Sequence, residues 1–237
     1  MVMKKLLLAG VGVAAMVGTA LAADMPMTMK APAYAPPFSW TGCYIGANFG
    51  SLFSTNGWNV AAPAAPVGTP ESSFDITDLQ GGLQGSCDYQ FSSWVLGVQG
   101  DYAWTQATGT AVGNFTTLTD QTKITSISSV TGRLGYAIDR WLPYVKGGGA
   151  WSSDKYSAFV PGAGVIASNV SGTRSGFTVG GGLEYAVVSN LSLFIEYDWF
   201  DFGTKTVTFG GATFPAMAIH ERDSVVKVGA NWKLWPW

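Results

Sequence analysis

Paired carboxylates are the first residues of this sequence that could do chemistry. Glu196 and Asp198 lie two positions apart in a segment of alternating polarity, so they would share one face of a strand. Two such carboxylates can serve as general acid and base. No nucleophile or base accompanies them, and the sole histidine, His220, excludes a histidine-based cluster within one chain. We therefore interpret both carboxylates as structural and expect no catalytic residue, cofactor or metal.

The two cysteines are the next candidates, and their chemistry depends on where the chain goes. Residues 1–22 contain two lysines, an apolar run and an Ala-x-Ala cleavage site, the pattern of a secretory signal peptide. Export places the chain in an oxidising compartment, where a cysteine pair more often forms a disulfide than a metal site. We therefore predict a bridge between Cys43 and Cys87. Residues 23–39 hold four prolines without periodicity and are predicted to be a periplasmic linker.

Composition narrows the class of protein. Only 12% of the residues are charged, against about 25% in ordinary soluble domains. The chain has 31 glycines, 10 tryptophans, 13 phenylalanines and 9 tyrosines, and its net charge of −2 provides no basic surface for nucleic acid. Beyond the signal segment, no stretch approaches the roughly 18 to 20 apolar residues of a membrane helix. If the chain spans a membrane, it must do so with strands.

The elements that would position these residues are strands of period two. The last one shows the pattern most clearly, with Val226, Val228, Trp232 and Leu234 on one face and Lys227 on the other. The same pattern recurs eight times, which predicts strands at 40–51, 78–91, 94–106, 123–138, 142–153, 173–188, 191–203 and 220–235. Short turns alternate with long polar connections at 52–77, 107–122, 154–172 and 204–219.

This alternation predicts an eight-stranded antiparallel up-and-down transmembrane β-barrel over residues 40–237, with short periplasmic turns and longer outer loops. A soluble lipocalin-like barrel is the alternative, but it would expose far more charge. Antiparallel pairing of the first two strands would bring Cys43 and Cys87 together at the periplasmic end. Aromatic belts are expected at both rims, with periplasmic candidates Trp94, Trp141, Trp232 and Trp235.

The polar strand faces would then line the lumen. An eight-stranded barrel is only wide enough for side chains to fill, so a wide aqueous channel is not expected. Buried charges must pair, which predicts a network of ion pairs and hydrogen bonds across the lumen. Its members would be Asp88, Asp101, Arg133, Lys146, Glu184, Glu196, Asp198 and Lys227.

Several motifs resemble those of a known family, the small alphaproteobacterial outer-membrane β-barrel proteins of porin-like and opacity type, whose barrel is similar to that of OmpA. The resemblance covers nearly the whole mature chain. It rests on the signal peptide and on four motifs: FSWTGCYIG at 38–46, GDYAW at 100–104, TGRLGYA at 131–137 and VKVGANWKL at 226–234.

The resemblance implies a location in the outer membrane and a role in envelope integrity and surface contact with a host. It implies that the barrel-assembly machinery reads the last strand at Val226, Val228, Trp232 and Leu234, although Leu234 stands where an aromatic residue is usual. The implied partners are outer-membrane lipid or lipopolysaccharide, this machinery and host surface molecules. A small-solute porin and a surface protein that binds haem or a host ligand stay as alternatives.

Overall fold

The chain folds into one antiparallel sheet in this computed structural model, which describes residues 38–62, 67–114, 119–160, 164–165, 170–208 and 216–235. The predicted signal peptide and residues 23–37 of the predicted linker lie outside these ranges. The strands are β1 Gly42–Ala62, β2 Pro70–Phe91, β3 Trp94–Thr105, β4 Thr108–Val112, β5 Thr119–Tyr136, β6 Trp141–Val160, β7 Gly164–Val165, β8 Val170–Val188, β9 Leu191–Val207 and β10 Ala216–Trp235. No helix among these residues is long and apolar enough to cross a membrane.

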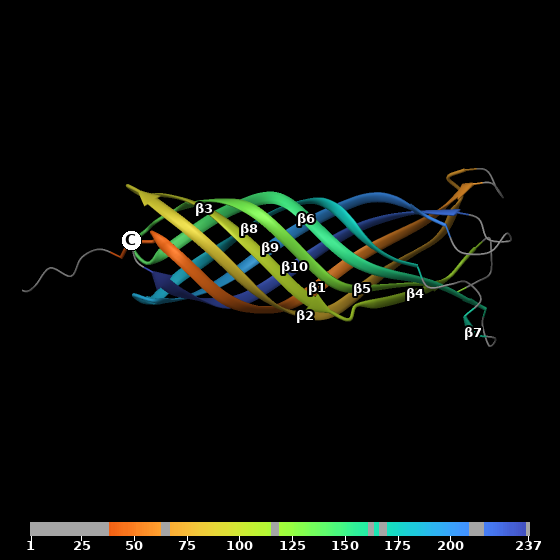
Figure 1. Cartoon of the computed structure of the whole chain (residues 1–237), viewed down its shortest axis with the longest axis horizontal. Helices are drawn as coiled ribbons and strands as arrows, with labels where there is room; N and C mark the ends of the chain where they lie inside the picture. Colours follow the sequence, from red (N-terminus) through yellow and green to blue (C-terminus); the bar gives the residue numbers. More distant parts are fainter. Residues whose placement is uncertain are drawn as a thin grey trace, which may run out of the picture. The chain divides into compact units, whose positions relative to one another are not determined.

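Eight long strands close into a ring. Their order is β5, β3, β2, β1, β10, β9, β8 and β6, and the pairing of β5 with β6 completes the circle. The first strand pairs with the last along its whole length, from Cys43 opposite Trp235 to Ala62 opposite Ala216. Figure 1 shows the tilted strands winding around a common axis. The predicted eight-stranded barrel is therefore confirmed, with β4 and β7 as short additions at one end.

Side chains alternate between the two faces of this sheet. The large apolar residues of the predicted outward faces are exposed, including Val226, Val228, Trp232 and Leu234 of the last strand. The polar residues between them, such as Lys227 and Asn231, are buried. A sheet with its apolar face outward and its polar face inward suits a lipid environment and is the reverse of a soluble barrel.

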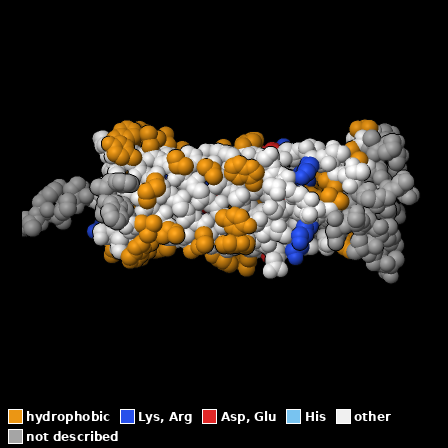
Figure 2. All heavy atoms as spheres, viewed as in Figure 1, with side chains coloured by type: hydrophobic (Ala, Val, Ile, Leu, Met, Phe, Trp, Pro, Cys, Tyr) orange, Lys and Arg blue, Asp and Glu red, His pale blue; other side chains and the backbone are white. Residues whose placement is uncertain are grey.

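The apolar outward face covers only one part of the barrel. It occupies residues 43–53, 79–91, 94–104, 130–136, 141–151, 177–187, 191–199 and 226–234, which we take as the membrane-spanning segments. Aromatic residues border it on both sides. Trp94, Trp141 and Trp232 lie at the end with the short turns, as predicted, and Phe53, Trp104 and Trp151 lie at the other. Figure 2 shows this hydrophobic zone and the few lysine and arginine side chains beyond it.

The predicted outer connections were too long. Residues 52–62 continue β1, and β2 already begins at Pro70, so most of the predicted first loop is paired strand. The second, third and fourth connections are shortened in the same way by β4, β5, β6, β8, β9 and β10. The reason is physical: above the lipid the outward residues become polar, which removes the alternation signal, while the backbone ladder continues.

Replacement of Val228 by Arg tests the assignment of the lipid face. Val228 lies midway along the apolar face of β10 and is 51% exposed. An arginine near the bilayer midplane is expected to lower the free energy of unfolding by about 2 to 4 kcal/mol. Urea unfolding in lipid vesicles measures this. Ser73→Arg is the matched control, since Ser73 is exposed on β2 beyond the apolar zone. Equal effects of the two substitutions would contradict the assignment.

Candidate functional site

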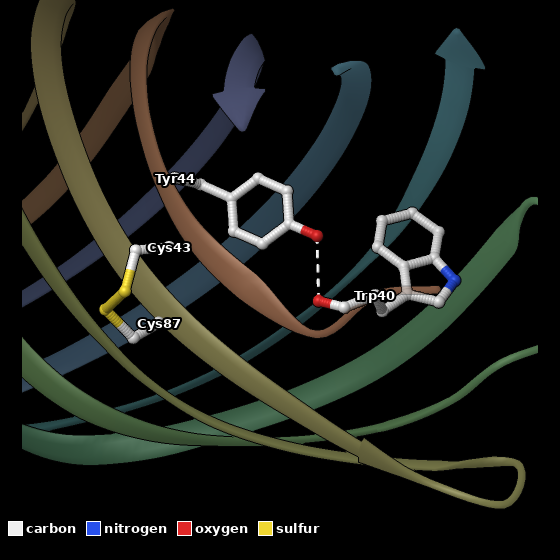
Figure 3. Close-up of a disulfide and its surroundings, with 4 residues drawn as sticks. All are labelled: Trp40, Cys43, Tyr44 and Cys87. Atoms are coloured by element: carbon white, nitrogen blue, oxygen red, sulfur yellow. Dashed lines mark hydrogen bonds between the residues drawn. A yellow bond between two sulfur atoms is a disulfide. The ribbon is translucent and has the colours of Figure 1, made fainter. Parts of the chain in front are cut away.

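A disulfide joins the first two strands at the end of the barrel that carries the short turns. Cys43 and Cys87 are direct cross-strand partners, and their sulfur atoms are bonded, as predicted. Both residues occupy the outward face, whereas the next residue, Tyr44, is buried in the lumen. Figure 3 shows the disulfide together with the lumen residues Tyr44 and Trp40. The bridge therefore fixes the register of β1 and β2 beside the strand that closes the barrel.

The segment before β1 enters the periplasmic mouth of the barrel. Trp40 is completely buried among Val95, Leu142 and Ala186. Its backbone carbonyl accepts a hydrogen bond of 2.8 Å from the Tyr44 hydroxyl, drawn in Figure 3, and its backbone N–H donates to Gln90 Oε1. Phe38, at the end of the predicted linker, packs against this apolar cluster. Sequence reasoning missed this closure, although two aromatic residues after a proline run were a visible signal.

Seven of the eight predicted lumen charges are buried and Asp101 is partly buried, and they lie in two connected groups. In the first group Arg133 forms ion pairs with Glu184 and, at 3.8 Å, with Asp88. Glu184 also accepts hydrogen bonds from Asn231 and Ser192. Three donors therefore compensate the one carboxylate for its lost hydration.

The second group surrounds two lysines. Lys146 lies 2.6 Å from Glu196, 3.2 Å from Asp198 and 3.4 Å from Asp101. Lys227 lies 2.8 to 3.0 Å from the same three carboxylates. Glu196 and Asp198 thus share one face of β9, as predicted, and their neighbours are ammonium groups and not a nucleophile.

Tyr144 links the two groups. Its hydroxyl donates a 2.6 Å hydrogen bond to Glu196, and the Arg133 guanidinium lies over its ring, 4.0 Å from the centroid. The predicted residues are therefore brought into one continuous set of contacts. Tyr144, Gln84, Asn231 and Ser192 belong to it as well, and their inward positions on the strands were the signal that could have found them.

Two inward glycines make room for this network. Gly97 lies between Asp88 and Arg133 in adjacent strands, and Gly180 lies between Lys146 and Asp198. A Cβ atom at Gly97 or Gly180 would collide with the carboxylate of Asp88 or Asp198, respectively. Because glycine has no side chain, the charged residues on the two strands beside each glycine can contact each other across it.

An apolar layer lies above the network, toward the long strand ends. It consists of nine buried residues packed in the lumen: Leu52, Ile76, Ala107, Ile124, Ile127, Ala150, Phe200, Phe202 and Val225. A cavity of about 20 Å³ remains between this layer and the network, lined in part by Asp101, Asp198 and Phe200. That volume admits about one water molecule.

A second set of charges, beyond the apolar layer, was missed by sequence reasoning. Arg174 lies 3.3 Å from Asp154 and 3.8 Å from Glu221, and its Nε donates to the Tyr156 hydroxyl. Asp223 is fully buried nearby, and no cation among the described residues lies within ion-pair distance of it. Several of these residues fall in or beside the predicted loops, where no strand face was assigned. We name Asp154, Arg174, Glu221 and Asp223 the outer charge cluster.

The outer charge cluster is short of positive charge, which shifts its titration. Burial raises the pKa of Glu221 well above its ordinary value, and the neighbouring Asp223 and Asp154 carboxylates add to this shift. Burial likewise raises the pKa of Asp223 to about 7. Burial also raises the pKa of Asp154, although Ser152, Tyr156 and Arg174 oppose the shift. These three carboxyl groups therefore take up protons at a higher pH than ordinary carboxyl groups do.

No group of three or more His, Cys, Asp or Glu side chains within the described ranges is arranged to hold a metal ion. His220 lies within β10, and its Nδ1 is 3.1 Å from Thr204 Oγ1. The residues of the expected assembly signal lie on the outward face of β10 beside β1 and β9. Their recognition stays a prediction.

The fold and the two faces of the sheet define an integral β-barrel of the outer-membrane type. Residues 11–232 match the family model described as outer membrane protein beta-barrel domain. The chain belongs to this outer-membrane β-barrel family.

Relatives in Brucella support the same assignment. The 31 kDa outer-membrane immunogenic protein of Brucella melitensis is 33% identical over 98% of this chain and 100% of its own length. The 25 kDa outer-membrane immunogenic protein of Brucella abortus is 28% identical over 82% of this chain and 83% of its own. The protein is therefore located in the outer membrane.

Solved structures agree on the fold. The outer membrane protease OmpT of Escherichia coli has a TM-score of 0.52 at 12% identity, covering 85% of this chain and 99% of its own. OprG of Pseudomonas aeruginosa has a TM-score of 0.50 at 11% identity, covering 83% and 97%. At this identity the likeness concerns the barrel alone.

Substitution of a cationic residue in the lumen should lower the free energy of unfolding more than substitution of a carboxylate does. The predicted network holds five carboxylates and three cations, so each cation compensates more than one acid. Lys227→Met is expected to lower the free energy of unfolding by about 3 to 5 kcal/mol, because it leaves buried carboxylates uncompensated. Asp198→Asn, the control, should cost about 1 kcal/mol or less. Urea unfolding in lipid vesicles, followed by tryptophan fluorescence, compares them, and equal losses would contradict this account.

Asp223→Asn tests the outer charge cluster through its pH dependence. A carboxyl group with a raised pKa binds its proton more tightly in the folded state, so its contribution to stability falls as the pH rises. The loss occurs between about pH 4, the ordinary value, and about pH 7 for Asp223. The substitution should therefore be nearly neutral at pH 4 and stabilising by at most about 4 kcal/mol at pH 8, which is the equivalent of a shift of about three pKa units. Urea unfolding at both pH values measures it, and a pH-independent difference would refute it.

Proposed function

We propose that the protein is a closed, non-catalytic barrel that supports the integrity of the outer membrane and presents its outer end for surface contacts. The length of the strands carries this proposal. β1 continues to Ala62, although its last lipid-facing aromatic residue is Phe53. With about 3.3 Å per residue and a tilt of about 40°, the strand ends stand roughly 20 Å above the apolar zone.

Side chains support the closed lumen in this proposal. The charge network, the apolar layer above it and the outer charge cluster follow one another along the axis, and Trp40 occupies the periplasmic mouth. Apolar layers oppose the passage of hydrated ions because ions lose hydration without gaining partners. Such a barrel would contribute mass and rigidity to the membrane and not permeability.

The rigid outer end supports the surface role. A second apolar cluster fills the lumen near the strand ends, with Trp58, Tyr156 and Ile219 among its fully or nearly fully buried members. The outer strand ends therefore form a packed base and not an open ring. The relatives named immunogenic outer-membrane proteins are consistent with a surface that is accessible from outside the cell.

Planar bilayer recording tests the closed lumen. The folded protein is expected to give no steady conductance, whereas a triple variant Leu52→Ala, Phe200→Ala and Val225→Ala, which thins the apolar layer, should conduct more often. Heat-dependent electrophoretic mobility confirms that both proteins are folded. Steady conductance of the unchanged protein would favour the small-solute porin instead.

Complementation of a deletion strain separates the two proposed roles. The full chain should restore resistance to detergent and attachment to host cells. A variant with segments 63–69 and 209–215, which join neighbouring strands, replaced by glycine and serine should restore resistance alone. If attachment is unaffected by the replacement, the surface role is wrong, and if the deletion leaves resistance unchanged, the integrity role is wrong.

A further inference from the structure

Two lysines face each other on the outward side of the barrel. Lys123 of β5 and Lys155 of β6 are direct cross-strand partners. Their chain neighbours Thr122, Ile124, Asp154 and Tyr156 are buried in the lumen, so alternation places both lysines outside. Like charges directly opposite one another destabilise a sheet unless a counter-charge lies between them. Because this strand register places two positive charges side by side, an anion bound between them would stabilise the sheet.

The described part of the chain supplies no anionic partner for the two lysines. Neither lysine forms an ion pair there, and the outward partners that flank the pair are Thr108 on β4 and Ser171 on β8. Ser153 on β6 and Thr173 on β8 are the next outward-facing residues toward the membrane, and they are cross-strand partners of each other. The surroundings thus offer hydroxyl donors and no carboxylate. By contrast, Arg222 on β10, also exposed, already has Asp201 at 3.2 Å.

The height of the lysine pair above the apolar zone indicates which anion the two side chains can reach. Trp151, at the border of the apolar zone, lies four residues before Lys155 on the same strand face. Four residues of tilted strand raise Lys155 about 10 Å above this tryptophan. The Lys155 backbone thus lies just above the lipid headgroup layer, which is about 5 to 8 Å thick, and a flexible lysine side chain can reach this layer by bending toward the membrane. Figure 2 shows lysine and arginine side chains just beyond the hydrophobic zone.

We propose that Lys123 and Lys155 together bind a phosphate group of an outer-leaflet lipid headgroup. Two ammonium groups supply the positive charge, and the neighbouring hydroxyl groups can donate hydrogen bonds to the phosphate oxygens. The inference rests on the proposed role in membrane integrity and deepens it by naming the chemical group that would link the barrel to the surrounding lipid.

Native mass spectrometry of the folded protein with lipid A tests this site. The double variant Lys123→Gln, Lys155→Gln should bind lipid A about 30-fold more weakly than the unchanged protein, and each single variant about 5-fold more weakly. Arg222→Gln is the matched control and should bind as before, because Arg222 has an internal partner. Lipid A without its phosphates should bind the unchanged protein as weakly as the double variant binds intact lipid A.

Competition measurements distinguish the possible sources of the phosphate. Inorganic phosphate should compete poorly, since it lacks the acyl chains that hold a headgroup at this height. The proposal is overturned if the double variant binds lipid A normally, if Arg222→Gln weakens binding equally, or if lysine-dependent binding is found only for a soluble polyanion. This measurement is independent of conductance and host attachment, so the proposed function and this site can fail separately.

Discussion

The ladder between β1 and β10 is the constraint on which the remaining structure depends. Once the first and last strands pair, the backbone ladder runs around the whole ring, and the sheet has no edge in lipid. Closure also divides the residues into two populations. Outward residues at membrane height must be apolar, and inward residues must fill a lumen too narrow for bulk water. The disulfide between Cys43 and Cys87 lies beside this ladder and holds the neighbouring strand in the same register.

The narrow lumen then governs how charge is distributed. Lys146 and Lys227 each contact three carboxylates, whereas Arg133 contacts two, so the cations are the scarce component. Gly97 and Gly180, which lie between charged residues of neighbouring strands, leave room for these contacts. The apolar layer separates this compensated network from the outer charge cluster, where a single arginine serves Asp154 and Glu221. One lumen therefore contains a network in which every carboxylate has a cation partner and a cluster in which Asp223 has none among the described residues.

Much of this arrangement could be predicted from the sequence where lipid imposes a pattern. Alternation at membrane height revealed the eight strands, the outward position of Val228 and Trp232, and the inward position of Asp88, Arg133 and Lys227. Above the lipid, polar residues such as Thr55 and Arg222 face water from the same strands, so the alternation fades although the pairing continues. Glu221 and Asp223 were missed for that reason. Trp40 was placed at the start of the predicted first strand, whereas β1 begins at Gly42 and Trp40 fills the periplasmic mouth, a position that no periodicity encodes.

Membership of the outer-membrane family accounts for the lower part of the barrel, which any such protein needs in order to span the membrane. It does not account for strands that run on past Phe53. Extra paired strand costs conformational entropy, and its lumen must be filled with packed side chains, here Trp58, Val60, Ile219 and their neighbours. A barrel that served only to span the bilayer would have no use for this addition. The outer extension is therefore the part of the molecule in which a role beyond membrane insertion has to be sought, and the lysine pair at its base marks where it meets the lipid.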